Sequence, residues 1–132
     1  MFRQVDQEFL YNARQDGSED GATCLMGLVL NGRLTVANLG DSIATVVRNN
    51  GCWEQLNTIH EPDRHDEKER ILQANGWVLK NRVNGELSVS RAFGDKEMKS
   101  LIICEPECRT IQMEQDHHLL ILASDGIHRS YT

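Results

Sequence analysis

The chain has 132 residues, of which 39% are hydrophobic, 26% charged and 5% aromatic, a composition that fits one modest soluble domain and excludes disordered and collagenous chains. Fourteen lysines and arginines against twenty aspartates and glutamates give a net charge of −6. Because neutralising phosphates supplies most of the affinity of nucleic-acid-binding proteins, this acidic balance argues against nucleic acid as a partner.

The N-terminal residues are predicted to form a helix. Phe2, Val5 and Phe9 recur at three- and four-residue spacing, which gives one apolar stripe between polar residues. This pattern ends at the polar, glycine-containing stretch 16–21, which is predicted to be a linker. Residues 25–30 are almost continuously apolar, as expected of a strand that is buried on both faces.

The next segments are predicted to be antiparallel strands. Asn31-Gly32 is the dipeptide that most readily takes the two positive φ angles of a type I′ hairpin turn. Strands are predicted at 33–39 and 43–48, and the chain then turns again toward Trp53. Together these segments predict an antiparallel meander.

A charged helix and a second hairpin are predicted to follow. Residues 63–74 have a helical pattern, and Asp63 is a plausible N-cap for this helix. The Asn-Gly dipeptide at 84–85 predicts a hairpin between strands at 77–83 and 87–89. Strands mixed with a few helices, without an internal repeat, indicate a single domain of the α+β class.

Two acids lie directly after predicted strands and beside a glycine. Asp41 follows the strand at 33–39, and Asp125 follows a strongly apolar strand predicted at 119–123. A carboxylate in this position can reach a ligand without obstruction by the backbone, and Mg²⁺ and Mn²⁺ prefer oxygen ligands. Each acid, taken alone, also fits an ordinary turn, so both interpretations stay open at this point.

Two further residues have alternative interpretations. Arg91 can bind a phosphate through two hydrogen bonds, or it can form a surface ion pair. His60, next to an acid and a proline, can serve as an acid or base, or as a hydrogen-bonded structural residue. The sequence contains no glycine-rich phosphate loop and no G-x-S-x-G motif.

The cysteines and the lengths of the apolar runs indicate the cellular compartment in which the protein is expected. There is no C-x-x-C pair, so the four cysteines are expected to be free thiols in a reducing compartment, the cytoplasm or the nucleus. No apolar run approaches the roughly 20 residues of a transmembrane helix. The acidic N-terminal residues do not fit a signal peptide, so neither secretion nor a membrane location is expected.

Taken in order, the motifs of this sequence resemble those of the metal-dependent serine/threonine protein phosphatases, the PPM or type 2C family. The resemblance covers roughly residues 1–127, and the long block at 82–95 is its most specific part. The matching stretches are Asp20-Gly-Ala-Thr23, 34–42, His60-Glu-Pro62, 69–71 with Gly76, Arg82 to Asp95, Pro106-Glu107 and 120–126.

This resemblance implies a partial four-layer α-β-β-α sandwich of antiparallel sheets. It implies hydrolysis of phosphoserine and phosphothreonine in a phosphorylated protein substrate, by a water activated at a binuclear Mg²⁺ or Mn²⁺ centre. By the same resemblance Asp125 is a ligand of the binuclear centre and Asp41 belongs to a weaker third metal. His60, Arg82 and Arg91 fall in the substrate and flap region.

The departures from the family pattern affect what this chain can do. The N-terminal metal-binding Asp, the Asp-Gly-His-Gly-Gly element, the phosphate-binding Arg and the C-terminal Gly-Asp-Asn do not occur in residues 1–132, and His128 and Arg129 stand where Trp-Asp is usual. We therefore expect the central part of a phosphatase domain, inactive alone, with a partner chain able to cover its missing sheet edges. The alternative is a pseudophosphatase-like binding or regulatory module without turnover.

Overall fold

The computed structural model of the protein describes residues 1–130, which fall into two units. Unit 1 comprises residues 1–23 and 60–106, and unit 2 comprises residues 24–59 and 107–130. Helices occur beside antiparallel sheets, so the predicted α+β class is confirmed. Among the described residues, no helix combines the length and the apolar character that crossing a membrane requires.

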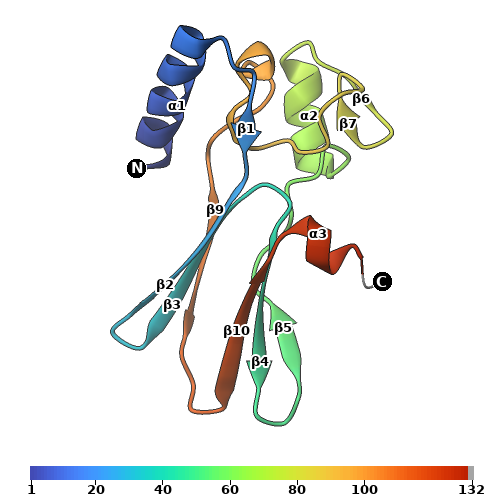
Figure 1. Ribbon diagram of the computed structural model, residues 1–132. Helices are drawn as coiled ribbons and strands as arrows, with labels where there is room; N and C mark the ends of the chain where they lie inside the picture. The colour runs from blue at the N-terminus through green and yellow to red at the C-terminus, as the bar shows by residue number, and fades with distance from the viewer. Residues whose placement is uncertain (131–132) are drawn as a thin grey trace. The chain divides into compact units, whose positions relative to one another are not determined.

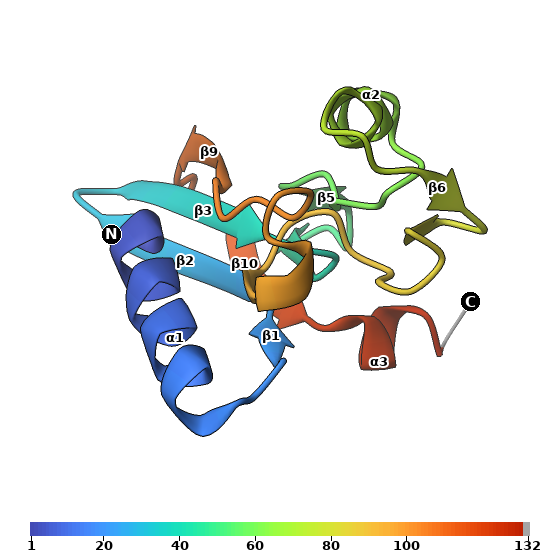
Figure 2. The same ribbon diagram turned by 90° about the horizontal axis from the view of Figure 1, so that it is seen from above.

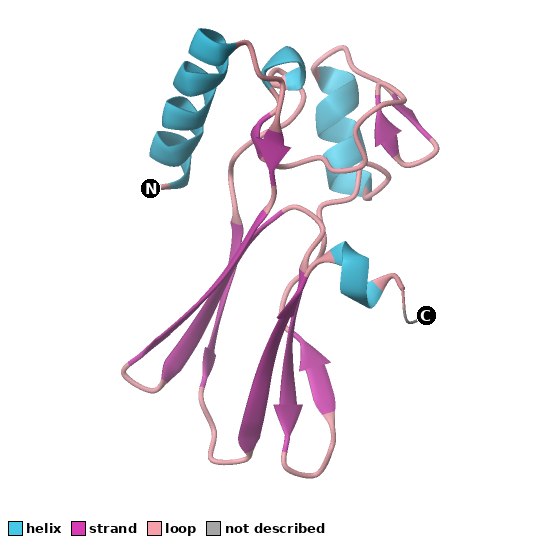
Figure 3. Cartoon of the chain, in the orientation of Figure 1, coloured by secondary structure: helices cyan, strands magenta, loops and turns pink. Residues whose placement is uncertain are grey.

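Unit 2 consists of two three-stranded antiparallel sheets and a short helix, α3 (Asp125–His128) (Figure 1 and Figure 3). Both sheets are built from strands that are distant in sequence. The first has the order β2 (Cys24–Leu30), β3 (Arg33–Leu39), β9 (Glu107–Gln112), and the second has the order β10 (His117–Ala123), β4 (Ile43–Arg48), β5 (Trp53–Gln55).

The core of unit 2 is formed by alternate residues of its strands. Side chains alternate between the two faces of a strand, so every second residue can face the same core. Leu34 and Val36 of β3 and Ala44 and Val46 of β4 are each at most 1% exposed, and Leu56 completes the cluster. The predicted β2–β3 hairpin is confirmed, because Asn31 and Gly32 have φ angles of 50° and 73°.

The predicted meander is wrong. The β2 and β3 strands pair, but β4 pairs with β5 and β10 in the other sheet. The second neighbour of β3 is β9, a strand that the sequence analysis did not predict. Because β9 already occupies that edge of β3, the chain leaves the sheet at Gly40, whose φ of 116° is accessible mainly to glycine.

The predicted burial of residues 25–30 on both faces is also wrong. Leu28, Val29 and Leu30 are 53%, 58% and 62% exposed, because β2 is an edge strand and no described segment of unit 2 covers this end of it. The edge strands β10 and β5 also carry exposed apolar residues, such as Leu119 on β10 and Trp53 on β5, which is 69% exposed. Unit 2 therefore presents apolar surface on several of its edge strands.

Unit 1 contains the longer helices. Figure 2 shows α2 nearly along its axis, with β6 beside it. The unit has a separate core, which Ile71, Val83, Val89, Ala92, Leu101 and Ile102 form. Its elements are α1 (Phe2–Asp16), β1 (Gly21–Ala22) paired with β8 (Phe93–Gly94), α2 (His65–Gln73), β6 (Val78–Leu79) paired with β7 (Arg82–Val83), and the 3₁₀ helix η1 (Lys96–Met98).

The predicted N-terminal helix is confirmed as α1, and it ends at Gly17 in the left-handed conformation. The predicted cap of the second helix is wrong. Helix α2 begins at His65, and Asp63 lies before it, where its carboxylate accepts a hydrogen bond from Lys68 Nζ at 3.2 Å. The ion pair with Lys68 therefore takes the place of the cap at Asp63.

The second hairpin turns earlier than predicted. Lys80 and Asn81 have φ angles of 51° and 57° and connect β6 to β7. The predicted strand at 77–83 is therefore two short strands. The Asn84-Gly85 dipeptide forms a tight turn of its own, closed by a bridge between Val83 and Leu87.

Candidate functional site

Strand pairing in unit 2 brings the two predicted metal-binding acids to one place. In the antiparallel pair of β10 and β4, Ala123 lies opposite Ile43. The residues that follow β10 therefore lie beside those that precede β4. Asp125 comes two residues after Ala123, and Asp41 comes two residues before Ile43.

The charges of the two carboxylates are coupled. The side chain of Asp41 is 9% exposed and that of Asp125 is 50% exposed. Burial raises the pKa of Asp41 above its ordinary value, and the negative charge of Asp125 raises this pKa further. A backbone hydrogen bond, Arg129 and His128 lower the same pKa, but they do not outweigh the first two effects.

A guanidinium group lies within ion-pair distance of both acids. Arg129 Nη2 is 3.6 Å from Asp41 Oδ2, and Arg129 Nη1 is 4.0 Å from Asp125 Oδ2. Asp125 and Arg129 are four residues apart, the spacing that places side chains on one face of a helical turn. His128 Nε2 also lies 3.0 Å from the carbonyl oxygen of Asp41. His128, the last residue of α3, and Arg129, which follows it, thus contact the turn that holds Asp41.

Two asparagines that no sequence motif singles out stabilise that turn. Asn38 Nδ2 donates to the carbonyl oxygen of Gly40 at 3.0 Å. Asn57 Nδ2 donates to the carbonyl oxygen of Ser42 at 2.9 Å, and its Oδ1 accepts a hydrogen bond from the amide of Ala44 at 2.7 Å. Asn38, between Ala37 and Leu39 in a predicted strand, was the available signal, because an amide side chain that becomes buried needs such partners.

The donor atoms at this site fit a hard divalent cation only in part. Two carboxylates supply the oxygen ligands that Mg²⁺ and Mn²⁺ prefer, and a bound cation would relieve their mutual repulsion. The guanidinium of Arg129 does not fit, because a metal held by both acids would lie next to a permanent positive charge. The residues as arranged therefore fit a metal poorly as long as Arg129 stays in place.

The other three predicted site residues lie in unit 1. His60 is buried, and its carbonyl oxygen accepts hydrogen bonds from the amide and the hydroxyl of Ser90, both at 3.0 Å. Arg82 is exposed on β7 and donates to the carbonyl oxygen of Glu86. Arg91 donates to Glu67 Oε1 from Nε at 3.0 Å and from Nη2 at 2.6 Å, which are the contacts of an ion pair.

Glu67 is the centre of this ion cluster. It is 1% exposed, and Arg70 Nη2 donates to its second oxygen at 2.8 Å. Burial raises the pKa of Glu67, but hydrogen bonds from Arg91, Ser90 and Arg70 outweigh the burial and lower the pKa to about 2. Glu67 therefore stays ionised and links α2 to the segment that carries Arg91.

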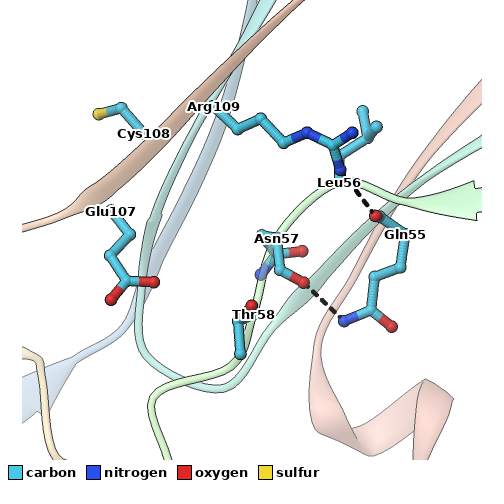
Figure 4. Close-up of a pocket in the computed structure, with 7 residues that line it drawn as sticks. All are labelled: Gln55, Leu56, Asn57, Thr58, Glu107, Cys108 and Arg109. Atoms are coloured by element: carbon cyan, nitrogen blue, oxygen red, sulfur yellow. Dashed lines mark hydrogen bonds between the residues drawn. The ribbon is translucent and has the colours of Figure 1, made fainter. Parts of the chain in front are cut away.

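A separate pocket of about 200 Å³ lies in unit 2 (Figure 4). In Figure 4 the guanidinium of Arg109 points toward Gln55, and Arg109 Nη1 donates to its carbonyl oxygen at 3.2 Å. Neither Asp41 nor Asp125 lines this pocket. The lining residues are Gln55, Leu56, Asn57, Thr58, Glu107, Cys108 and Arg109.

A second acidic group in unit 2 could compete for a cation. Glu114, Asp116 and His117 place one ligand atom each within 4.8 Å of one another. Arg48 Nη1 is already bound to both acids, at 2.7 Å from Glu114 Oε2 and 2.8 Å from Asp116 Oδ1. This ion pair satisfies the charge of the group without a metal.

Comparison with known protein families gives one match along the chain. The family model described as "Protein phosphatase 2C" matches residues 1–132. Probable protein phosphatase 2C 11 of Arabidopsis thaliana is 41% identical over 132 residues, and probable protein phosphatase 2C 14 of the same plant is 40% identical over 130 residues. The alignments cover 96% of this chain but only 34% and 28% of these relatives.

Solved structures give the same fold. A serine-threonine phosphatase 2C from Toxoplasma gondii superimposes with a TM-score of 0.88 at 27% identity, covering 99% of this chain and 50% of that one. A C. elegans sex determining protein superimposes with a TM-score of 0.91 at 28% identity, covering 99% of this chain and 33% of that one. The chain thus spans half or less of each of these proteins.

Proposed function

This chain belongs to the protein phosphatase 2C family, and from this membership we propose that it serves as the central part of a protein serine/threonine phosphatase domain. The observation that carries the proposal is the family match along all 132 residues, combined with the proximity of Asp41 and Asp125. Family membership implies dependence on magnesium or manganese.

Asp125 and Asp41 are the proposed metal ligands. Their coupled charges support this role, because two carboxylates held together repel each other until a cation or a proton neutralises one of them. Asn38 and Asn57 hold the turn of Asp41 in place, as a ligand-bearing turn requires. His60, Arg82 and Arg91 stay assigned to the substrate and flap region, where Arg91 is bound to Glu67.

The proposed substrate is a phosphorylated protein, and the proposed compartment is the cytoplasm or the nucleus. All four cysteines are free thiols, which supports a reducing environment.

On β10, Leu119, Ile121 and Leu122 are between 42% and 51% exposed, and β2 is similarly exposed. These apolar edge strands support the proposal that further polypeptide covers them in the active protein.

A second candidate function is a binding or regulatory module without turnover. One observation favours it: Arg129 supplies a positive charge to both proposed metal ligands. The retention of Asp125 and of the long block at 82–95 favours the phosphatase.

Activity in a chimera tests the proposed function. Residues 1–127 would replace the corresponding segment of probable protein phosphatase 2C 11, and hydrolysis of a phosphothreonine peptide would be measured with millimolar Mn²⁺. We expect hydrolysis by the chimera, loss of hydrolysis in Asp125→Asn, and no hydrolysis by the 132-residue chain alone. A folded chimera without activity would contradict the phosphatase proposal, and activity of the chain alone would contradict the proposal that it is incomplete.

A further inference from the structure

Arg129, which directly follows α3, carries a positive charge where the proposed function needs a metal. Arg129 lies 3.6 Å from a side-chain oxygen of the buried Asp41 and 4.0 Å from one of the more exposed Asp125, through two different nitrogens of one guanidinium. Two negative charges and one positive charge therefore share a small volume in unit 2. An arginine is always charged, so this positive charge persists at every physiological pH.

We propose that Arg129 is a built-in counter-cation that competes with a divalent metal for Asp41 and Asp125. This inference rests on the proposed function, because it takes these two acids as the metal ligands. A metal that binds both carboxylates must either displace the guanidinium or bind beside it. Both routes weaken metal binding, the first through the loss of an ion pair and the second through repulsion between like charges.

The position of Arg129 makes displacement feasible. Its side chain is 42% exposed, whereas that of Asp41 is 9% exposed. The buried acid is therefore the fixed partner, and the arginine can rotate into solvent without leaving a cavity in the core. His128 remains at the carbonyl oxygen of Asp41, so the turn keeps one of its contacts when Arg129 moves. The site thus has a closed state, with Arg129 bound, and an open state that can accept a metal.

Direct measurement of Mn²⁺ binding tests this proposal without any assay of activity. The signal of free Mn²⁺ in electron paramagnetic resonance would be titrated with the 132-residue chain, Arg129→Gln and Asp125→Asn/Arg129→Gln. Arg33→Gln is the matched control, because it removes the same charge from an exposed position at the start of β3 in the same unit. Circular dichroism would establish that each chain is folded.

We expect Arg129→Gln to bind Mn²⁺ about tenfold more tightly or better, since a full positive charge is removed from within 4.0 Å of the ligand oxygens. Arg33→Gln should bind Mn²⁺ with the affinity of the unmodified chain. Asp125→Asn/Arg129→Gln should bind Mn²⁺ more weakly than Arg129→Gln does. If Arg129→Gln and the unmodified chain bind Mn²⁺ equally and the double variant binds more weakly, the proposed role of Arg129 is wrong. Asp125 would then still be supported as a metal ligand. Tighter binding that survives Asp125→Asn would instead refute Asp125 as a ligand, and with it this proposal.

Discussion

Glu67→Gln tests the ion cluster that stabilises unit 1. The substitution keeps the size of the side chain and removes its charge, which leaves Arg91 and Arg70 without their shared acid. The side chains of these arginines are 12% and 26% exposed, and that of Glu67 is 2% exposed. Removing one partner of a buried ion pair costs about 3–5 kcal/mol, and the partial exposure of Arg70 places this case near the lower end.

The lowered pKa of Glu67 expresses the same interaction as a dependence of stability on pH. It is lowered from an ordinary value of 4.5 to about 2, and this shift corresponds to about 3 kcal/mol in favour of the ionised form in the folded chain. A pKa that is lower in the folded state stabilises the fold above the ordinary pKa. The stabilisation is therefore complete above about pH 4.5 and is lost as the pH falls toward about 2.

Urea denaturation measures this loss in unit 1 alone. Each unit contains one tryptophan, so in a Trp53→Phe background the fluorescence of Trp77 reports unit 1. Glu69→Gln is the matched control, because it makes the same change at an exposed position of the same helix, where an effect within about 0.5 kcal/mol is expected. Glu67→Gln should lower the free energy of unfolding by about 3 kcal/mol at pH 7 and by less at pH 3. An effect no larger than that of Glu69→Gln would refute the reasoning.

Two further substitutions test the turns. Asn57→Ala removes the partners of the Ser42 carbonyl and the Ala44 amide, so we expect a loss of about 1–3 kcal/mol of stability in unit 2, measured by the fluorescence of Trp53 in a Trp77→Phe background. Gly94→Ala places a side-chain carbon 2.4 Å from the carbonyl oxygen of Asp20 at a φ of 71°, so we expect a loss of about 2 kcal/mol or more in unit 1, and an unchanged denaturation midpoint would contradict it.

Individual strands and turns could be predicted because they depend on residues that are close together in the sequence. The strands at 33–39 and 43–48 have the bounds of β3 and β4, and the Asn31-Gly32 turn follows from the conformations that its two residues favour. Which strands become neighbours could not be predicted in the same way, because β9 reaches β3 from about 70 residues away in sequence. β9 itself carries few apolar residues, so it gave no clear strand signal.

The candidate site likewise combines residues that the sequence could indicate with contacts that it could not. The positions of Asp41 and Asp125 after predicted strands made them candidates, and the family resemblance supplied their role as metal ligands. The pairing of β4 with β10 explains why both signals concern one place. The resemblance already implied a cation at Arg129 in place of a carboxylate that helps hold the third metal, but the ion pair with Asp41 could not be derived from local spacing, because it spans 88 residues. The helical spacing of Asp125 and Arg129 was visible in the sequence, but it indicated only half of the arrangement.

The location of a bound cation tests most directly the claim that Asp41 and Asp125 are the metal ligands. Mn²⁺ broadens the NMR signals of nearby nuclei, so substoichiometric Mn²⁺ added to the isotope-labelled Arg129→Gln chain identifies the residues around the ion. We expect broadening of the backbone amide signals of Asp41, Ser42, Asp125 and Gly126. Broadening centred on the group of Glu114, Asp116 and His117, with the signals of Asp41 and Asp125 unaffected, would contradict the assignment of the cation site.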